Sequence, residues 1–206
     1  MNTSETHHLL EKATKYSYAD YRKLLTDLMA ENKTTGPNQS PDILEYSKLN
    51  LQRMNRLDKT LTLQPELAEA LQNLNRNLYW VVITEGWCGD AAQNVPVFDV
   101  VAKASGGKIK LDLVLRDENL ELMDRYLTNG GRSIPKMICF DAETGEELGT
   151  WGPRPAEAQN LFLELKQKPD LTMQEFTHAL HTWYSQDKTR QMQHELTELL
   201  KTWQKS

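Results

Sequence analysis

Hydrophobic residues in the first third of the chain recur at the spacing of a helix. One helical face is formed by positions i, i+3, i+4, i+7 and i+8, which are Tyr21, Leu24, Leu25, Leu28 and Met29. Pro41 and Pro65 each favour the first turn of a further helix. We therefore expect residues 1–77 to form a helical N-terminal extension whose apolar faces pack on the domain that follows.

From residue 78 the pattern becomes that of strands. Residues 78–84 are a continuous run of β-branched and aromatic residues, which is typical of a strand in a sheet covered on both faces. The predicted strands are 78–84, 109–115, 135–140 and 147–151. The predicted helices between and after them are 88–104, 119–127 and a helix that follows Pro155.

The order strand, helix, strand, helix, strand, strand, helix predicts an α/β domain over residues 78–168. A helical crossover favours parallel pairing of the first two strands, and the two adjacent later strands suit an antiparallel hairpin. The sheet should therefore be mixed and flanked by helices. Residues 169–206, which begin with Pro169, carry two more apolar helical faces and are expected to form a C-terminal helical extension.

Composition narrows the function classes. The chain has 206 residues, of which 39% are hydrophobic, and its net charge is −5. A weakly acidic chain lacks the basic field that attracts nucleic acid or an anionic membrane, so we expect neither as a partner. No apolar run is long enough for a signal peptide or a membrane span, which predicts a cytoplasmic protein. His7 and His8 lie in a polar N-terminal stretch and are expected in solvent.

Only two cysteines are present, Cys88 and Cys139. Two cysteines are too few for a disulfide-stabilised secreted scaffold. Neither has a cysteine or histidine at the spacing of a zinc site, and the glycine pairs lack the spacing of a nucleotide-binding loop. We therefore expect neither metal nor cofactor.

Cys88 lies where the first predicted strand gives way to a helix. The unpaired N–H groups and the dipole of a helix N-terminus stabilise a thiolate there, and the thiolate is the nucleophile in thiol–disulfide exchange. The polar neighbours Gly89 and Asp90 favour a reactive cysteine over an inert buried one. Glu85 and Asp90 oppose the helix effect by like-charge repulsion, and the sequence leaves open which effect prevails.

The segment Trp87-Cys88-Gly89-Asp90 resembles the Trp-Cys-Gly-x-Cys turn of the thioredoxin superfamily. Pro96, eight residues after the cysteine, matches the kink proline of that family, and Ser133-Ile134-Pro135 resembles the loop that bears its cis-proline. The sequence pattern of the core as a whole is similar to that of a bacterial thioredoxin-like group.

The resemblance implies a thioredoxin-like fold in which Cys88 is the catalytic thiol. The residues it implies around a bound substrate are Trp87, Gly89, Asp90, Ile134 and Pro135. Arg132, near the proline loop, either binds an anionic substrate or is an ordinary surface arginine.

The sequence departs from the family pattern at three positions. All three concern the step in which a second cysteine breaks the mixed disulfide. Ala91 occupies the place of the resolving cysteine, Val82 that of a buried aspartate and Leu113 that of its partner lysine. Cys139 lies four residues after Pro135, about 13 Å along an extended strand, whereas disulfide-bonded Cα atoms lie within about 7 Å. Cys139 is therefore expected to be a buried hydrophobic residue.

These observations predict a monothiol redox protein, active in cell redox homeostasis, whose Cys88 forms mixed disulfides with a protein or a low-molecular-weight thiol. The alternative is a non-catalytic binding module that keeps the groove beside Trp87 and Pro135. A peroxidase-like use of Cys88 ranks last because no supporting arginine or threonine pattern is present. The sequence leaves the oligomeric state open.

Overall fold

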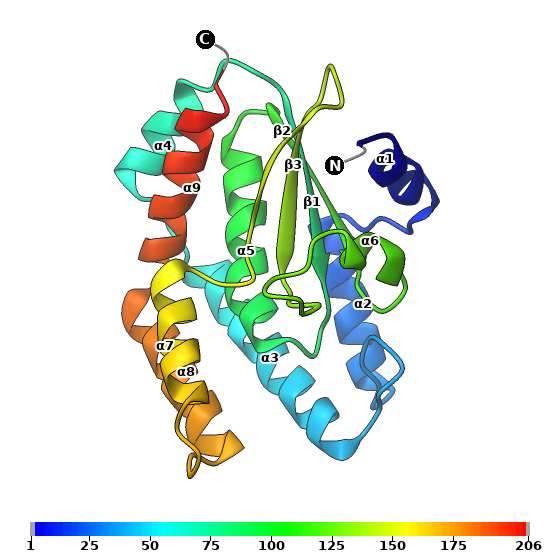
Figure 1. The fold of residues 1–206 in the computed structure, drawn as a ribbon, viewed down its shortest axis with the longest axis vertical. Helices are drawn as coiled ribbons and strands as arrows, with labels where there is room; N and C mark the ends of the chain where they lie inside the picture. The colour runs from blue at the N-terminus through cyan, green and yellow to red at the C-terminus, as the bar shows by residue number, and fades with distance from the viewer. Residues whose placement is uncertain (1–2, 205–206) are drawn as a thin grey trace.

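The computed structural model describes residues 3–204 and is built around a mixed four-stranded sheet (Figure 1). Its strands are β1 (Leu78–Thr84), β2 (Ile109–Leu115), β3 (Lys136–Asp141) and β4 (Glu147–Trp151). They lie in the order β2-β1-β3-β4, with β1 parallel to β2 and antiparallel to β3. Strands β3 and β4 form an antiparallel pair. The α/β fold class, with a mixed sheet flanked by helices and with helical extensions, is therefore confirmed.

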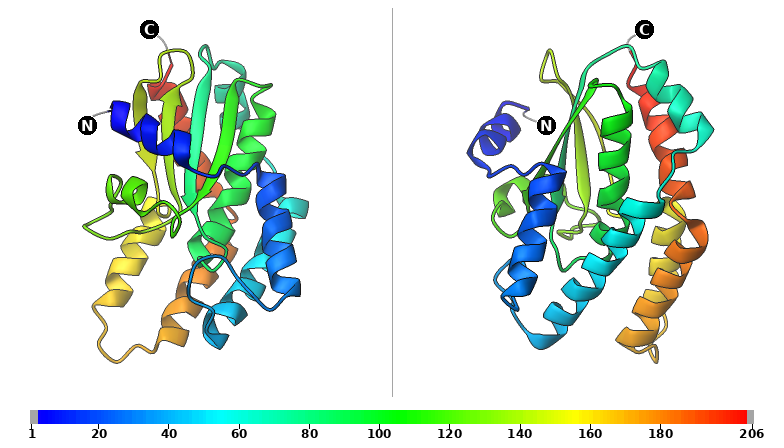
Figure 2. Two further views of the ribbon diagram at one scale, coloured as in Figure 1. Left: turned by 90° about the vertical axis from the view of Figure 1, so that its right-hand side faces the viewer. Right: turned by 180° about the vertical axis from the view of Figure 1, so that it is seen from behind.

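The helices form layers on both faces of this sheet. They are α1 (Thr3–Lys12), α2 (Tyr18–Ala30), α3 (Pro41–Thr60), α4 (Pro65–Gln72), α5 (Gly89–Ala104), α6 (Leu120–Asp124), α7 (Ala156–Lys166), α8 (Met173–Asp187) and α9 (Arg190–Thr202). Helix α5 lies against one face with α3, α4 and α9 outside it, and α1 and α6 lie on the opposite face (Figure 2). Helices α7 and α8 run side by side beyond the end of the sheet. Among residues 3–204, no helix is both long and apolar enough to cross a bilayer.

Strand β1 is the centre of the core because it pairs on both sides. Six of its seven residues are buried, as its continuous apolar sequence predicts. Helix α5 supplies the crossover that makes the β1–β2 pair parallel. Pro41 and Pro65 stand in the first turns of α3 and α4, where the missing proline N–H costs no hydrogen bond.

The structure differs from the expected elements in two places. Helix α6 spans only Leu120–Asp124 rather than 119–127, and the chain turns further on at Asn129 and Gly130, which both have positive φ. His7 is the second difference: it was expected in solvent, but it is half-buried, and its ring lies 5.0 Å from the ring of Phe140 in a tilted arrangement. Helix α1, which carries His7, belongs to the expected helical extension and packs through Leu10.

The C-terminal residues are divided between two hydrophobic clusters. Helix α9 joins the main core through Met192, Leu196, Leu200 and the following Trp203. Helices α7 and α8 form a smaller cluster of their own around Ala158, Leu180 and Tyr184. The first two and the last two residues of the expected extensions lie outside the described residues.

Trp203→Ala should destabilise the protein strongly. The side chain is 4% exposed, and its indole Nε1 donates a hydrogen bond to the Leu148 carbonyl at 3.0 Å. Truncation of a buried tryptophan leaves a cavity, so we expect a loss of about 3–5 kcal/mol in the free energy of unfolding, measured by urea titration. Met173→Ala, at a residue that is 71% exposed, should change it by about 0.5 kcal/mol or less. Equal effects of both substitutions would contradict the packing described.

Candidate functional site

Cys88 is the N-cap residue of α5, directly after the turn that follows β1. Its Sγ accepts a hydrogen bond from the Ala91 N–H at 3.4 Å, which is the usual role of an N-cap side chain. This places the sulfur at the positive end of a 16-residue helix. The sequence predicts this placement at the start of a helix, because Cys88 lies where the strand pattern gives way to a helix pattern.

The loop before β3 faces the sulfur. The Ile134–Pro135 peptide bond is cis, and Cys88 Sγ–H donates to the Ile134 carbonyl oxygen at 3.2 Å. Ile134 and Pro135 therefore border the thiol, but their side chains are buried. Cys88 itself is only 8% exposed.

Lys136 connects this loop to a second cis-proline, Pro153, in the segment after β4. Its buried Nζ donates to the Thr128 hydroxyl at 2.8 Å and to the Gly152 carbonyl at 3.2 Å. Burial lowers the pKa of Lys136. The two proline loops are thus held against one another beside the thiol.

Asp90, the second residue of α5, is the centre of a buried polar network. Arg154 donates to Asp90 Oδ2 from Nη2 at 2.6 Å and from Nε at 3.1 Å, and both side chains are about one-tenth exposed. The Tyr184 hydroxyl of α8 donates to Asp90 Oδ1 at 2.6 Å and accepts from Asn94 at 3.1 Å. The network joins the start of α5, the loop after β4 and the C-terminal helix α8.

The environment of Cys88 disfavours its thiolate. Burial raises the pKa of the Cys88 thiol to about 12, and the negative charge of Asp90 acts in the same direction. The N–H groups of Ala91 and Asp90 and the charge of Arg154 lower this pKa, but by less. The polar neighbours therefore do not leave the thiol open to solvent, in contrast to the expectation from the sequence, because Asp90 is buried and paired with Arg154.

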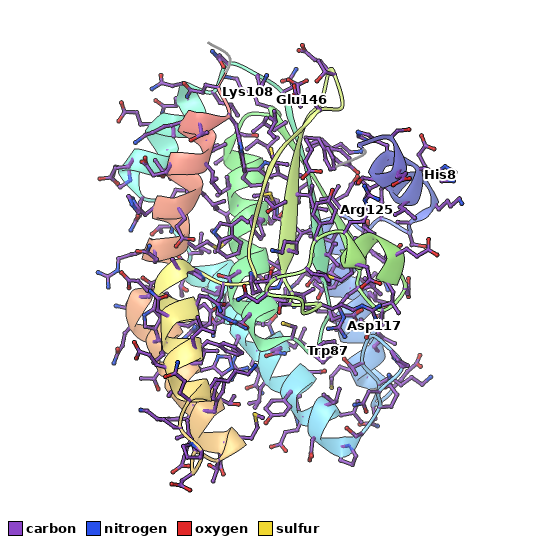
Figure 3. All side chains as sticks on the ribbon, viewed as in Figure 1. His8, Trp87, Lys108, Asp117, Arg125 and Glu146 are labelled. Carbon is purple, nitrogen blue, oxygen red and sulfur yellow. The ribbon has the colours of Figure 1, made fainter. Side chains whose placement is uncertain are left out.

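Glu85 and Trp87 lie on the other side of the turn. The buried Glu85 carboxylate accepts from the Asp117 N–H at 2.8 Å, and burial raises the pKa of Glu85. The half-buried Trp87 ring lies 4.6 Å from the Arg116 guanidinium, and Figure 3 shows Trp87 and Asp117 close together at this end of the sheet. Both residues thus anchor the turn to the loop after β2.

Arg132 and Cys139 lie outside this arrangement. Arg132 is an exposed arginine whose guanidinium pairs with Asp124 at 2.6 Å. Cys139 is fully buried on β3, opposite Trp80 of β1, and both cysteines are free. Burial raises the pKa of Cys139 to about 12. Within residues 3–204, no three histidine, cysteine or acidic side chains gather where they could hold a metal ion.

Sequence reasoning missed three residues of the site: Arg154, Tyr184 and His181. Tyr184 falls on one of the two apolar helical faces of residues 169–206, but a buried tyrosine hydroxyl usually has a hydrogen-bond partner. The His181 ring is so close to Gly89 that a Cβ there would lie 3.0 Å from it.

Comparisons with known proteins agree with this fold. The sequence profile of the thioredoxin family matches residues 36–170, which is more than half of the chain. The chain therefore belongs to the thioredoxin family.

One curated relative is thioredoxin 1 of Nostoc sp. (strain PCC 7120), which is 41% identical over 54 residues. That alignment covers 26% of this chain, and the chain spans about half, 48%, of the relative.

Two solved structures share the fold over 90% of this chain and 98% of theirs. One is a Pseudomonas aeruginosa protein of unknown function, with a TM-score of 0.56 and 18% identity. The other is an HIV epitope scaffold, with a TM-score of 0.55 and 17% identity.

Asp90→Asn should make Cys88 more reactive. The substitution removes a negative charge that raises the pKa of Cys88 and retains the charge of Arg154, which lowers it. Because the buried Arg154 then lacks its carboxylate partner, circular dichroism is used to verify that the variant is folded. We expect a several-fold faster alkylation by iodoacetamide at pH 8 in a Cys139→Ala background. Asp99→Asn, further along the same helix, is the matched control and should leave the rate unchanged. An unchanged rate in Asp90→Asn would show that Asp90 does not control the thiol.

His181→Gln should weaken the acid sensitivity of the fold. Burial and Arg53 lower the pKa of His181 from 6.5 to about 4, so the unfolded chain binds a proton on acidification before the folded chain does. The wild-type protein should therefore lose up to about 3 kcal/mol of its free energy of unfolding between pH 6.5 and pH 4 through this group. Urea titrations at both pH values should show a smaller loss in His181→Gln, and the exposed His8 gives the control His8→Gln. Identical losses in all three proteins would refute the assignment.

Proposed function

We propose that this protein is a monothiol thiol–disulfide exchange protein in which Cys88 forms mixed disulfides. The observation that carries the proposal is the position of Cys88 Sγ at the N-cap of α5, 3.2 Å from the carbonyl oxygen of Ile134. Membership of the thioredoxin family supports redox chemistry in general. Ala91 in the place of a second thiol supports a mechanism with one cysteine.

The exchange takes place in two balanced steps. The Cys88 thiolate attacks a disulfide R–S–S–R′, a Cys88–S–S–R bond forms, and R′–S⁻ leaves and takes up the proton that Cys88 lost. A second, low-molecular-weight thiol R″–SH then attacks the mixed disulfide as its thiolate. It releases R–S–S–R″ and returns Cys88 to the thiol form.

The raised pKa of Cys88 slows the first step. Only a small fraction of the sulfur is thiolate at neutral pH, so attack on a disulfide is slow. No second cysteine lies beside the mixed disulfide to break it, because Cys139 is on β3 and fully buried. This arrangement fits adducts with protein or low-molecular-weight thiols that form slowly and are long-lived. In the reducing cytoplasm, other thiols exchange with these adducts.

A second candidate function is a binding module without catalysis. The low exposure of Cys88, 8%, and its raised pKa favour this alternative. Partners would then bind noncovalently beside Trp87 and the proline loop, and the cysteine would be dispensable.

Covalent capture under mild oxidation distinguishes the two functions. In a lysate treated briefly with a mild oxidant, wild type and Cys139→Ala should form adducts that survive nonreducing electrophoresis and disappear on reduction. Cys88→Ser should form none. Absence of adducts in all three proteins would overturn the exchange function, and partners that Cys88→Ser retains equally well would establish the binding module.

A further inference from the structure

Helices α7 and α8 form a hairpin, residues 156–187, that is joined to the rest of the protein in an unusual way. Its buried apolar side chains form a cluster of their own around Ala158, Leu180 and Tyr184. In the described part of the chain, residues 3–204, no side chain of this hairpin belongs to the main hydrophobic core. Segments with few apolar contacts to the core open at a lower free-energy cost than the core itself. This packing favours a hairpin that can separate from a folded core.

Two clefts lie between α8 and α3. One, of about 640 Å³, is lined by Leu49 and Arg53 of α3 and by His178 of α8. The other, of about 410 Å³, lies at the C-terminal end of α8 and is lined by Arg56 and Lys188. Closely packed helices leave few voids larger than a water molecule between them. Helix α8 therefore faces α3 across clefts rather than through a continuous packed interface.

Polar contacts join α8 to α5. The Tyr184 hydroxyl donates to Asp90 Oδ1 at 2.6 Å and accepts from Asn94 Nδ2 at 3.1 Å. Nearer the N-terminus of α8, His181 Nδ1 lies 3.4 Å from Gln93 Nε2. Water can replace these partners when the helices separate, so the net free-energy cost of breaking the contacts is modest.

These contacts cover the start of α5. The His181 ring lies so close to Gly89 that a Cβ there would be 3.0 Å from it. Gly89 directly follows Cys88, whose Sγ caps the same helical turn and whose side chain is 8% exposed. In this closed arrangement a substrate has little access to the sulfur, so a neighbouring element has to move before the thiol can react.

The link between α8 and α9 has the properties of a hinge. Lys188 and Thr189 have φ values of 54° and 67°, in the left-handed region that β-branched residues such as Thr189 strongly disfavour. Rotation of the hairpin changes these angles, as in hinges whose few residues absorb a change in φ and ψ. At the other root, the Ala156 N–H donates to Glu195 Oε1 of α9 at 2.7 Å. Both roots thus lie against α9, and the loop between α7 and α8 lies at the opposite end of the hairpin (Figures 1 and 2).

We propose that the α7–α8 hairpin is a lid over the start of α5, hinged at Lys188 and Thr189, whose opening with the core still folded gives access to Cys88. In the closed state Tyr184 and His181 hold the lid on α5. In the open state the first turn of α5 faces solvent. The role of the lid in admitting a disulfide rests on the exchange function, but the motion itself does not.

The urea dependence of thiol alkylation tests the lid. Cys139→Ala retains only Cys88, and Cys88→Ser retains only Cys139, which is fully buried on β3 and reports the unfolding of the core. Both proteins are alkylated with iodoacetamide at pH 8, at urea concentrations below the unfolding transition, and followed by intact mass. Urea promotes each opening in proportion to the surface that the opening exposes.

The logarithm of the rate at Cys88 should rise with urea at less than about half the slope found at Cys139, since the lid exposes only part of the surface that unfolding exposes. Hydrogen exchange should give the amides of residues 156–187 the same opening free energy as Cys88 alkylation, below that of β1. A slope at Cys88 equal to that at Cys139 would mean that only unfolding exposes the thiol. A slope of zero would mean that the thiol reacts without any opening, and either result overturns the lid.

Two tyrosine variants, each made in both single-cysteine backgrounds, test the contact that holds the lid. Tyr184→Phe keeps the ring and removes the hydroxyl that donates to Asp90, so Cys88 alkylation should accelerate by roughly tenfold or more, with the shallow urea slope retained. Tyr18→Phe is the matched control, because its hydroxyl donates to Asp58 at 2.6 Å, between α2 and α3. It should leave Cys88 alkylation unchanged, whereas Cys139 alkylation should accelerate in both variants.

Equal acceleration at Cys88 in both variants, or none in Tyr184→Phe, contradicts the lid. Circular dichroism verifies that both variants are folded. Because alkylation uses no disulfide, the lid and the exchange function can fail separately. An opening lid in a protein that forms no mixed disulfides supports the lid alone, and mixed disulfides without a partial opening support the exchange function alone.

Discussion

The buried ion pair between Asp90 and Arg154 is the interaction on which the arrangement of the site depends. These two side chains are each about one-tenth exposed, and they are stabilised in the interior by one another and by the Tyr184 hydroxyl, which donates to the second carboxylate oxygen. Removal of one partner from such a pair typically costs about 3–5 kcal/mol, since the other charge is left buried. The start of α5, the loop after β4 and α8 are thereby fixed relative to each other.

The same pair also influences the chemistry of Cys88. The sulfur has the donors of a helix N-terminus, which favour a thiolate, but burial and the Asp90 carboxylate outweigh them. A charge two residues from the thiol is therefore held in place by residues far away in the sequence. Any change that moves Arg154 or α8 therefore alters the electrostatic potential at Cys88 Sγ without a direct contact with the sulfur.

Much of the fold could be predicted because the signals are local. Each strand is marked by β-branched or alternating residues, and the prolines at 41 and 65 mark helix starts directly. The N-cap position of Cys88 follows from the change from strand to helix pattern. The roles of Arg154 and Tyr184 could not be predicted, because each depends on contacts across 64 and 94 positions of the chain. The contact between His7 and Phe140 could not be predicted for a similar reason, since the two residues lie far apart in the sequence.

Other segments of the chain form hydrogen bonds with the two edge strands of the sheet, β2 and β4. At β2, the backbone of Tyr16 exchanges two hydrogen bonds of 2.9 Å with Leu113. At β4, the indole of Trp203 donates to the carbonyl of Leu148. Unpaired strand edges are the places where a partner adds a strand or where chains aggregate edge to edge. At these two positions the chain occupies its own edges, so the addition of a strand from another chain is blocked there.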